Sequence, residues 1–293
     1  MKKIVTHNSS FHTDDIFAVA TLLLVEPEAR VVRSREKEEI KSADYVIDVG
    51  MVYDPSTNRF DHHQLGGAGV RKNGIPYASF GLVWKEFGER LSGGKREAEI
   101  IDSFLIQSID AHDNGVATSE SKFGGVKEYS IGDFFSSYLV DYDIDADGIY
   151  KIFMGNVDIA KNLLTREVKR AKAMALGENI FKDCYEQSKD KRLIEVPKEG
   201  LPWDSIAGRF PEPLYVVYPR RDGNWSIKAV SDITKPYGYQ RKALPKEWAA
   251  KRDEELQKVT GVADALFCHS KRFMASAGSK EGALKLAEVA LNA

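Results

Sequence analysis

The sequence predicts an α/β protein whose N-terminal half is built on a mostly parallel sheet. Short apolar runs at 4–6, 31–32 and 45–50 alternate with longer segments whose apolar residues recur at helical spacing, and such alternation is typical of α/β folds. The run at 45–50 is nearly continuous, as in strands buried on both faces of a parallel sheet. We therefore expect an α/β domain over residues 1–142, with helices on both faces of its sheet.

The helices expected in this domain follow from the spacing of apolar residues. Residues 14–25 begin with two aspartates, which favour a helix N-terminus, and continue with apolar residues at helical spacing. A glycine-rich loop at 65–69 precedes two further segments of the same kind, 77–91 and 96–111. We expect these helices to cover the sheet.

A long helical segment separates the two halves of the chain. Residues 144–186 are largely free of proline and carry apolar residues at helical spacing, which predicts one or two long helices. We assign residues 143–190 as a helical linker between the domains.

The C-terminal part, residues 191–293, is expected to be a smaller α+β domain. Its strand-like runs are short and are separated by proline and glycine turns, at 193–196, 214–218 and 225–230. The chain then continues with a predicted helix, a strand and a closing helix, at 246–260, 265–268 and 280–291.

Composition narrows the class of protein. The chain has 293 residues, of which 43% are hydrophobic and 29% charged, as in globular proteins rather than disordered chains. Its net charge of −2 means that an anionic substrate would be met by local basic groups or metal ions. Cys184 and Cys268 lie far apart and are expected to be free thiols, which fits a reducing compartment. Because the N-terminus lacks an apolar signal segment and no run approaches the ~20 apolar residues of a membrane span, we expect a cytoplasmic protein without a membrane partner.

Histidines and aspartates cluster in the N-terminal half. Five of the six histidines fall before residue 113, and each group lies beside aspartates: His7 and His12 with Asp14, His62 and His63 with Asp61, and His112 with Asp110. Asp48 ends an apolar strand, where a charged residue is costly unless it is paired. Mixed imidazole and carboxylate ligands suit Mn²⁺, Zn²⁺ or Co²⁺ better than Ca²⁺. Each group alone could be a helix cap or a salt bridge, but the four together predict a metal centre.

Four strings in this region carry a resemblance to a known family: THNSSFHTDD at 6–15, DVGMVYDP at 48–55, DHHQ at 61–64 and DAHDNG at 110–115. The order of these strings resembles that of the four motifs of the DHH phosphoesterase superfamily. Their residues resemble, more narrowly, those of the melanocyte proliferating gene one family. The C-terminal strings PYGYQRKALPKEW at 236–248 and HSKRF at 269–273 are similar to that family as well. The resemblance covers nearly the whole chain.

The resemblance implies a DHH-type catalytic domain with a dinuclear metal centre. In that reading His7 and His12 bind one ion, Asp14, His62 and Asp110 bind the other, and Asp48 bridges both. Two divalent ions are expected, with Mn²⁺ favoured and Mg²⁺, Co²⁺ or Zn²⁺ as alternatives.

Three neighbouring residues are expected to act beside these ligands. We expect His63 to donate to a substrate phosphate and Asp61 to orient its neighbours, so that both join Asp48 as catalytic residues. Asp113 is left open between a ligand and a group that orients ligands.

Two basic clusters in the C-terminal domain are candidates for substrate binding. Arg241 and Lys242 follow Tyr237 and Tyr239, and a second cluster contains His269 and Arg272 ahead of Ser276 and Gly278. Cationic and aromatic side chains together suit a single nucleic acid strand, and serine and glycine before a helix suit an anion. Solvated surface charges are the alternative interpretation, above all for the first cluster.

The resemblance implies a metal-dependent phosphodiesterase, expected to be a 3′–5′ exonuclease on RNA or short oligonucleotides. Two alternatives remain open: a hydrolase of small phosphoanhydrides or nucleotides, which would need no stacking aromatics, and a non-catalytic metal-binding regulatory protein. A homodimer is a further open expectation.

Overall fold

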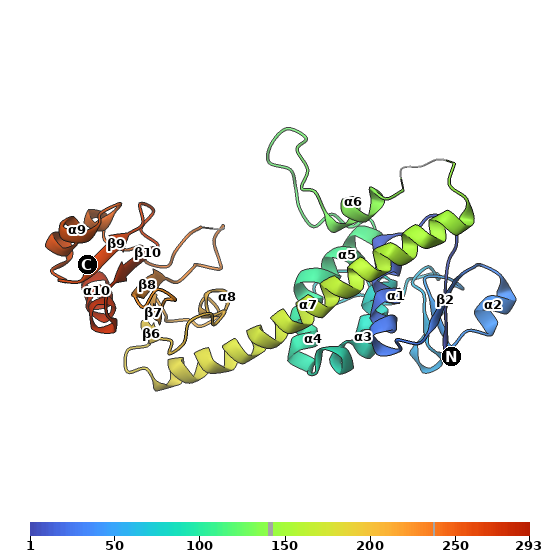
Figure 1. The fold of residues 1–293 in the computed structure, drawn as a ribbon, viewed down its shortest axis with the longest axis horizontal. Coiled ribbons are helices and arrows are strands. Elements are labelled where there is room, and N and C mark those ends of the chain that lie inside the picture. The colour runs from blue at the N-terminus through green and yellow to red at the C-terminus, as the bar shows by residue number, and fades with distance from the viewer. Residues whose placement is uncertain (140–142, 237) are drawn as a thin grey trace. The chain divides into compact units, whose positions relative to one another are not determined.

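The computed structural model describes residues 1–139, 143–236 and 238–293, and within them the chain forms two compact units, Met1–Lys172 and Ala173–Ala293. Helix α7, Ala146–Gln187, contains the point of division and matches the long helix expected at 144–186 (Figure 1). Residue 142, where the first domain was expected to end, lies outside the described residues. The proposed boundaries at 142 and 190 remain predictions.

The first unit is built on a five-stranded sheet of order β2-β1-β3-β5-β4. Strands β2, β1, β3 and β5 are parallel neighbours, and β4 is antiparallel to β5. The strands are β1 Lys3–Thr6, β2 Arg30–Arg33, β3 Tyr45–Ile47, β4 Tyr53–Asp54 and β5 Arg59–Phe60. The α/β class is therefore confirmed, whereas β4 and β5 were too short to be expected from an apolar pattern.

Helices cover both faces of this sheet. Helices α1, Thr13–Val25, and α3, Ser79–Ser92, pack together on one face, where Phe17 stacks on Phe80 at 5.1 Å between ring centroids. On the other face Ile40 of α2, Lys37–Lys41, packs against a buried cluster that includes Val5 and Val46. In Figure 1, α2 stands on one side of the strands and α1 and α3 on the other.

A continuous helical stretch leads from α3 toward the carboxyl ends of the strands. It consists of α4, Lys95–Ile101, a π-helical turn, Asp102–Ile106, and α5, Gln107–Asp113. The expected helix at 96–111 is therefore present, with one wider turn that the sequence did not indicate. Such π-helical turns occur often at functional sites, and here the stretch ends on Asp110 and Asp113. A short helix, α6, Ile131–Ser136, follows.

The second unit contains a five-stranded sheet of order β6-β7-β8-β10-β9, in which only the β6–β7 pair is parallel among the described strands. The strands are β6 Leu193–Glu195, β7 Tyr215–Pro219, β8 Trp225–Ala229, β9 Ala265–Cys268 and β10 Met274–Ala277. Helix α10, Lys280–Asn292, buries its apolar face on this sheet, and α8, Asp204–Ala207, belongs to a second cluster with Phe181 and Val216.

Two sequence expectations for the second unit are wrong. The single helix expected at 246–260 is instead a 3₁₀ turn, Lys246–Trp248, followed by α9, Asp253–Thr260. The helix is interrupted because Ala250 has a φ of 60° and the Lys251 carbonyl accepts the Cys268 N–H at the edge of β9. The second concerns the segment around Ser276, which lay outside the expected strands but forms strand β10.

None of the helices in the described ranges combines the length and the apolar character that a membrane crossing requires. Cys184 and Cys268 are both free cysteines.

Replacing glycine with alanine should change the stability of the protein in opposite directions at Gly81, where α3 contacts α5, and at Gly155 in α7. A Cβ at Gly81 would overlap Oδ2 of Asp110, whereas a Cβ at Gly155, on the exposed side of α7, would meet no atom within 4 Å. We expect Gly81→Ala to lower the free energy of unfolding by about 1–3 kcal/mol through overpacking. Gly155→Ala should raise it by roughly 0.5–1 kcal/mol because alanine loses less backbone entropy in a helix. Urea unfolding followed by circular dichroism measures both, and equal effects would contradict the packing described here.

Candidate metal centre

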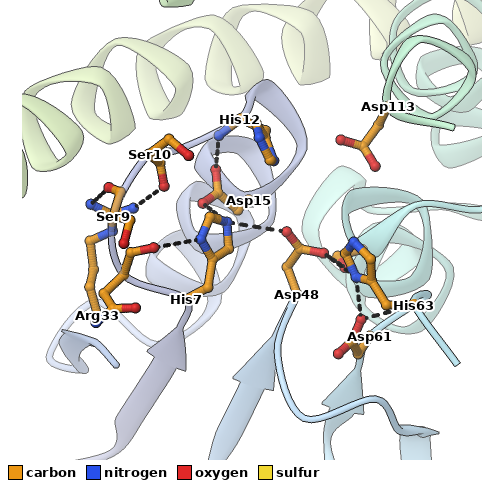
Figure 2. A network of polar contacts seen from close by, with 12 residues as sticks. His7, Ser9, Ser10, His12, Asp15, Arg33, Asp48, Asp61, His63 and Asp113 are labelled. Atoms are coloured by element: carbon orange, nitrogen blue, oxygen red, sulfur yellow. Dashed lines mark hydrogen bonds and ion pairs between the residues drawn. The ribbon is translucent and has the colours of Figure 1, made fainter. Parts of the chain in front are cut away.

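The candidate site forms where three neighbouring parallel strands end. His7 directly follows β1, Asp48 directly follows β3, and Asp61, His62 and His63 directly follow β5. Because parallel strands end at the same edge of a sheet, their polar side chains converge in the crevice where α/β proteins bind ligands. Figure 2 shows His7, Asp48, Asp61 and His63 side by side above the strand ends.

His7 lies between two carboxylates. Its Nε2 is 3.0 Å from Asp15 Oδ2 and 3.4 Å from Asp48 Oδ2, while its Nδ1 is 3.0 Å from the Asn8 carbonyl. Neither His7 Nε2 nor Asp15 Oδ2 has a partner in hydrogen-bond geometry within the described residues. When His7 is protonated, its imidazolium forms an ion pair with both carboxylates.

Asp15 also organises the backbone at this position. Its Oδ1 accepts the N–H of His12 at 3.0 Å, which caps the first turn of α1. The Asp15 carboxylate therefore contacts both the backbone of His12 and the ring of His7, which lies five residues before His12. The sequence motif contained Asp15, but nothing in it distinguished this residue from Asp14.

The Asp61-His62-His63 string places two imidazoles beside Asp48. His62 Nε2 and His63 Nδ1 are each 3.4 Å from Asp48 Oδ1. Buried Asp61 accepts the backbone N–H of His63 at 3.0 Å and that of Met51 at 2.6 Å, and it lies 2.8 Å from His63 Nδ1. Asp61 thus fixes the ring of His63, whose side chain is 52% exposed.

Asp48 is held in a strained position at the centre of this cluster. Its φ of 55° is in the left-handed region, which costs a non-glycine residue about 1 kcal/mol or more. The Ser79 hydroxyl at the start of α3 donates to Asp48 Oδ1 at 3.0 Å. Both oxygens of the carboxylate therefore face polar groups from different elements, with His7 on one side and His62 and His63 on the other.

A third set of groups comes from α1 and from the end of α5. Asp14 is completely buried, and neither of its carboxylate oxygens has a hydrogen-bond partner in the part of the chain that the structure describes. Asp113 lies 3.0 Å from His62 Nε2 through Oδ2. Burial, together with the nearby carboxylates of Asp48 and Asp113, raises the pKa of Asp14 well above its usual range. An unpaired buried carboxylate is costly, and a bound cation would remove this cost.

The electrostatics of the metal-free centre set the conditions under which a cation would bind. Burial alone would lower the pKa of His7, but Asp15 and Asp48 raise it to about 10; Asp113 and Asp48 likewise raise that of His62 to about 10. The two imidazoles are therefore protonated at neutral pH, and they favour folding most fully below pH ~6.5, an effect lost toward pH 10. A metal ion must displace these protons, so its affinity should rise with pH.

Three sets of side chains have ligand atoms close enough to hold an ion. They are His7 with His12 and Asp48, Asp48 with His62 and His63, and His12 with Asp14 and Asp113, and the atoms of each set lie within 4.8 Å of one another. Asp48 belongs to two sets, which is the position that a bridging carboxylate needs. The donor set of imidazole nitrogens and carboxylate oxygens, together with the unpartnered oxygens of Asp14, fits a divalent transition metal.

Asp110, an expected ligand, belongs to none of these sets in the described residues. Its Oδ2 lies 2.7 Å from Arg71 Nη2, and its Oδ1 accepts the N–H of Gly81 at 3.0 Å. Burial raises the pKa of Asp110 to about 7 even though Arg71 favours the charged form. Asp110, in α5, therefore contacts Arg71, which follows the glycine-rich loop, and Gly81 of α3. Asp113, one turn later, lies beside His62.

The expected substrate-binding cations of the second unit are engaged within that unit. Arg241 donates to the backbone carbonyls of Gly208, Phe210 and Pro213. Lys242 donates to the Leu291 carbonyl at 2.9 Å, and Arg272 donates to the Leu244 carbonyl at 3.0 Å. Tyr237 lies outside the described residues, and Tyr239 is exposed. These contacts account for Arg241 and Arg272 without a ligand.

The remaining candidates of the second cluster do not form an anion site at a helix start. The ring of His269 packs on that of Phe273 at 4.3 Å, and Ser276 is only 8% exposed within β10. Gly278 donates its N–H to the Asp264 carbonyl, and the Asp264 carboxylate accepts the hydroxyl of Ser279, the N-cap of α10. An acidic side chain thus lies where an anion was expected.

Known proteins similar to this chain match it over almost its entire length. The mouse and human proteins named MYG1 exonuclease are 27% and 28% identical to it, over 99% of this chain and 84% and 85% of their own. The Dictyostelium discoideum protein named MYG1 protein is 29% identical over 99% of this chain and 96% of its own. No solved structure matches the chain.

A family model, MYG1_exonuc, described as Uncharacterised protein family (UPF0160), matches residues 3–291. Because the match extends through both compact units, from β1 to the end of α10, this chain belongs to the MYG1 family.

Proposed function

We propose that this protein is a metal-dependent phosphodiesterase of the DHH type, acting as a 3′–5′ exonuclease on RNA or short oligonucleotides. The observation that carries the proposal is the position of Asp48, whose carboxylate is shared by two sets of ligand atoms at the edge of a parallel sheet. The mammalian relatives named exonuclease support nucleic acid as the substrate class.

The residues that would hold two divalent ions, Mn²⁺ being favoured, differ in one respect from the original expectation. His7, His12, Asp14, Asp48 and His62 lie together, and Asp113 takes the position beside His62 that was assigned to Asp110. Two divalent ions sharing a carboxylate would lower the pKa of a water molecule toward neutrality and neutralise charge on phosphate oxygens.

The protein's own side chains would orient the substrate and manage protons. His63 is fixed through Nδ1 by Asp61, which leaves Nε2 on its exposed side to donate to a phosphate oxygen. Ser79 fixes the rotation of the Asp48 carboxylate by donating to Oδ1. Asp61 acts at a distance from the reacting atoms, because its oxygens are taken by Met51 and His63.

The same proposal assigns residues 191–293 to substrate binding and places the protein in the cytoplasm. Support for the first part is limited to the exposed Tyr239, since Arg241, Lys242 and Arg272 donate to backbone carbonyls of their own unit and the ring of His269 packs on that of Phe273.

A nuclease assay with a variant of the shared carboxylate tests this function. With Mn²⁺ present, we expect the protein to shorten 5′-labelled single-stranded RNA stepwise from the 3′ end. Asp48→Asn should lower the rate by about 100-fold or more, because one change removes a charged ligand from both sets. The exposed change Asp147→Asn, at the start of α7, is the matched control and should leave the rate unchanged.

Pyrophosphate and a mononucleotide serve as second substrates in the same assay. Phosphate release from these compounds with intact RNA would replace the exonuclease with a small-molecule phosphohydrolase. If the protein binds Mn²⁺ but hydrolyses none of these substrates, the enzymatic proposal is wrong and a regulatory metal-binding role takes its place.

Substitutions at Asp110 and Asp113 test which of the two aspartates binds the metal ion. We expect Asp113→Asn to weaken Mn²⁺ binding by about 10-fold or more in titration calorimetry, because its carboxylate lies beside His62 and Asp14. Asp110→Asn should leave Mn²⁺ binding nearly unchanged but lower the melting temperature, because Arg71 loses a buried charged partner. The reverse pattern would restore Asp110 as the ligand.

A further inference from the structure

Arg33 lies beside the metal centre, although no motif in the sequence marked it. It ends β2, the strand next to β1, and its guanidinium donates to the carbonyls of Ser9 and Ser10 at 3.1 and 2.7 Å. Figure 2 shows both contacts reaching the loop between His7 and His12. Arg33 therefore holds the loop that connects His7 and His12, which belong to the same set of candidate ligands.

The guanidinium is partly buried between two aromatic rings. It lies 4.6 Å from the ring centroid of Phe153 in α7 and 5.8 Å from that of Phe11, and Nε is buried without a hydrogen-bond partner in the described residues. Burial lowers the pKa of Arg33 from its usual value. Arginine is still charged at any physiological pH, so the two rings, the two carbonyls and the nearby Asp15 carboxylate compensate its lost hydration.

The loop between His7 and His12 is strained and exposed, so contacts such as those from Arg33 are needed to fix its conformation. Ser9 has a φ of 70°, in the left-handed region, which a residue with a Cβ adopts only when its surroundings enforce it. Asn8, Ser9 and Ser10 are exposed, so little packing holds the loop from outside. The two hydrogen bonds from Arg33 come from the protein side and fix consecutive carbonyls.

We propose that Arg33 is a positioning residue for the metal centre: it holds the loop 8–11 so that His12 stays near His7 and Asp48. Without it, the ring of His12, which is exposed, would sample positions away from the other two groups. The inference rests on the proposed metal centre and goes beyond it by assigning a role to a residue that supplies no atom to the three ligand sets.

The planar fork of arginine is what this role requires. Two amino groups at fixed separation meet two successive carbonyls, and the flat cation packs on Phe153. A lysine would keep the charge but has a single ammonium on a flexible stem, so it cannot hold both carbonyls in one geometry.

The test compares Arg33→Lys with Arg30→Lys, an identical change at the exposed start of the same strand. Titration calorimetry with MnCl₂ should show that Arg33→Lys weakens one of two binding events by about 10- to 100-fold, as is typical when a group that orients ligands is lost. Arg30→Lys should match the unsubstituted protein. In the metal-free proteins, amide hydrogen exchange of residues 8–12 should be faster in Arg33→Lys alone.

The kinetic readout separates positioning from substrate contact. If Arg33 acts through His12, Arg33→Lys should lower kcat for RNA with KM unchanged, and excess Mn²⁺ should recover part of the loss. An increased KM at saturating Mn²⁺ would instead make Arg33 a substrate contact.

Overlapping Mn²⁺ isotherms and equal amide exchange for Arg33→Lys and Arg30→Lys would overturn the proposal. Failure of the unsubstituted protein to bind Mn²⁺ would instead overturn the proposed metal centre. If Arg33→Lys does not fold, Arg33→Gln, which keeps a donor without the charge, takes its place under the same criteria. Loss of folding in both variants would assign Arg33 to fold stability and refute the positioning role.

Discussion

The surplus of buried negative charge at one edge of the first sheet is the constraint on which the site depends. Asp14, Asp48 and Asp61 are almost completely buried, and Asp15 and Asp113 lie beside the same histidines. Imidazoles are the cations that face them, and in the absence of metal the carboxylates keep His7 and His62 protonated by raising their pKa to about 10. Buried carboxylates at this density are expensive unless a cation is shared among them. Asp14, which has no hydrogen-bond partner among the described residues, makes this cost most evident.

The fold provides the convergence that this charge distribution requires. Three parallel strands end together, and each end contributes a candidate ligand group within a few residues of the last ladder bond. The backbone is strained where it turns away from the sheet, since Asp48 and Met51 have φ values of 55° and 61°. Asp61 offsets part of that strain by accepting the Met51 N–H, and Arg33 does the same for the loop around Ser9. Rigid support of this kind favours metal binding because the ligands need little reorganisation.

The sequence predicts those features whose cause lies in neighbouring residues, such as the spacing of apolar side chains along one segment. Strands β1 to β3, helix α1 and helix α7 carry patterns of apolar spacing, so their positions follow from the sequence alone. The convergence of His7 and Asp48 follows too, because each comes just after an expected strand, whereas the strand that precedes His62, β5, was too short to be expected. Metal binding by these residues remains a prediction from the geometry.

Other features depend on contacts between distant segments and could not be predicted. Asp110 and Asp113 lie three residues apart in one helix, but Arg71, which follows the glycine-rich loop, pairs with Asp110, whereas Asp113 lies beside His62. Likewise the carbonyls around Gly208 that receive Arg241 come from a loop with no sequence signal for it. The expected helix at 246–260 failed because its middle pairs with the edge of β9, where tertiary hydrogen bonds prevail over local helix propensity.

An anomalous difference map from crystals grown with Mn²⁺, recorded at the manganese absorption edge, would show whether Asp48 bridges two metal ions at this sheet edge. We expect two peaks, one beside His7 and one beside His62, with the Asp48 carboxylate between them. A single peak away from Asp48, or none at full Mn²⁺ occupancy in solution, would contradict this bridging role.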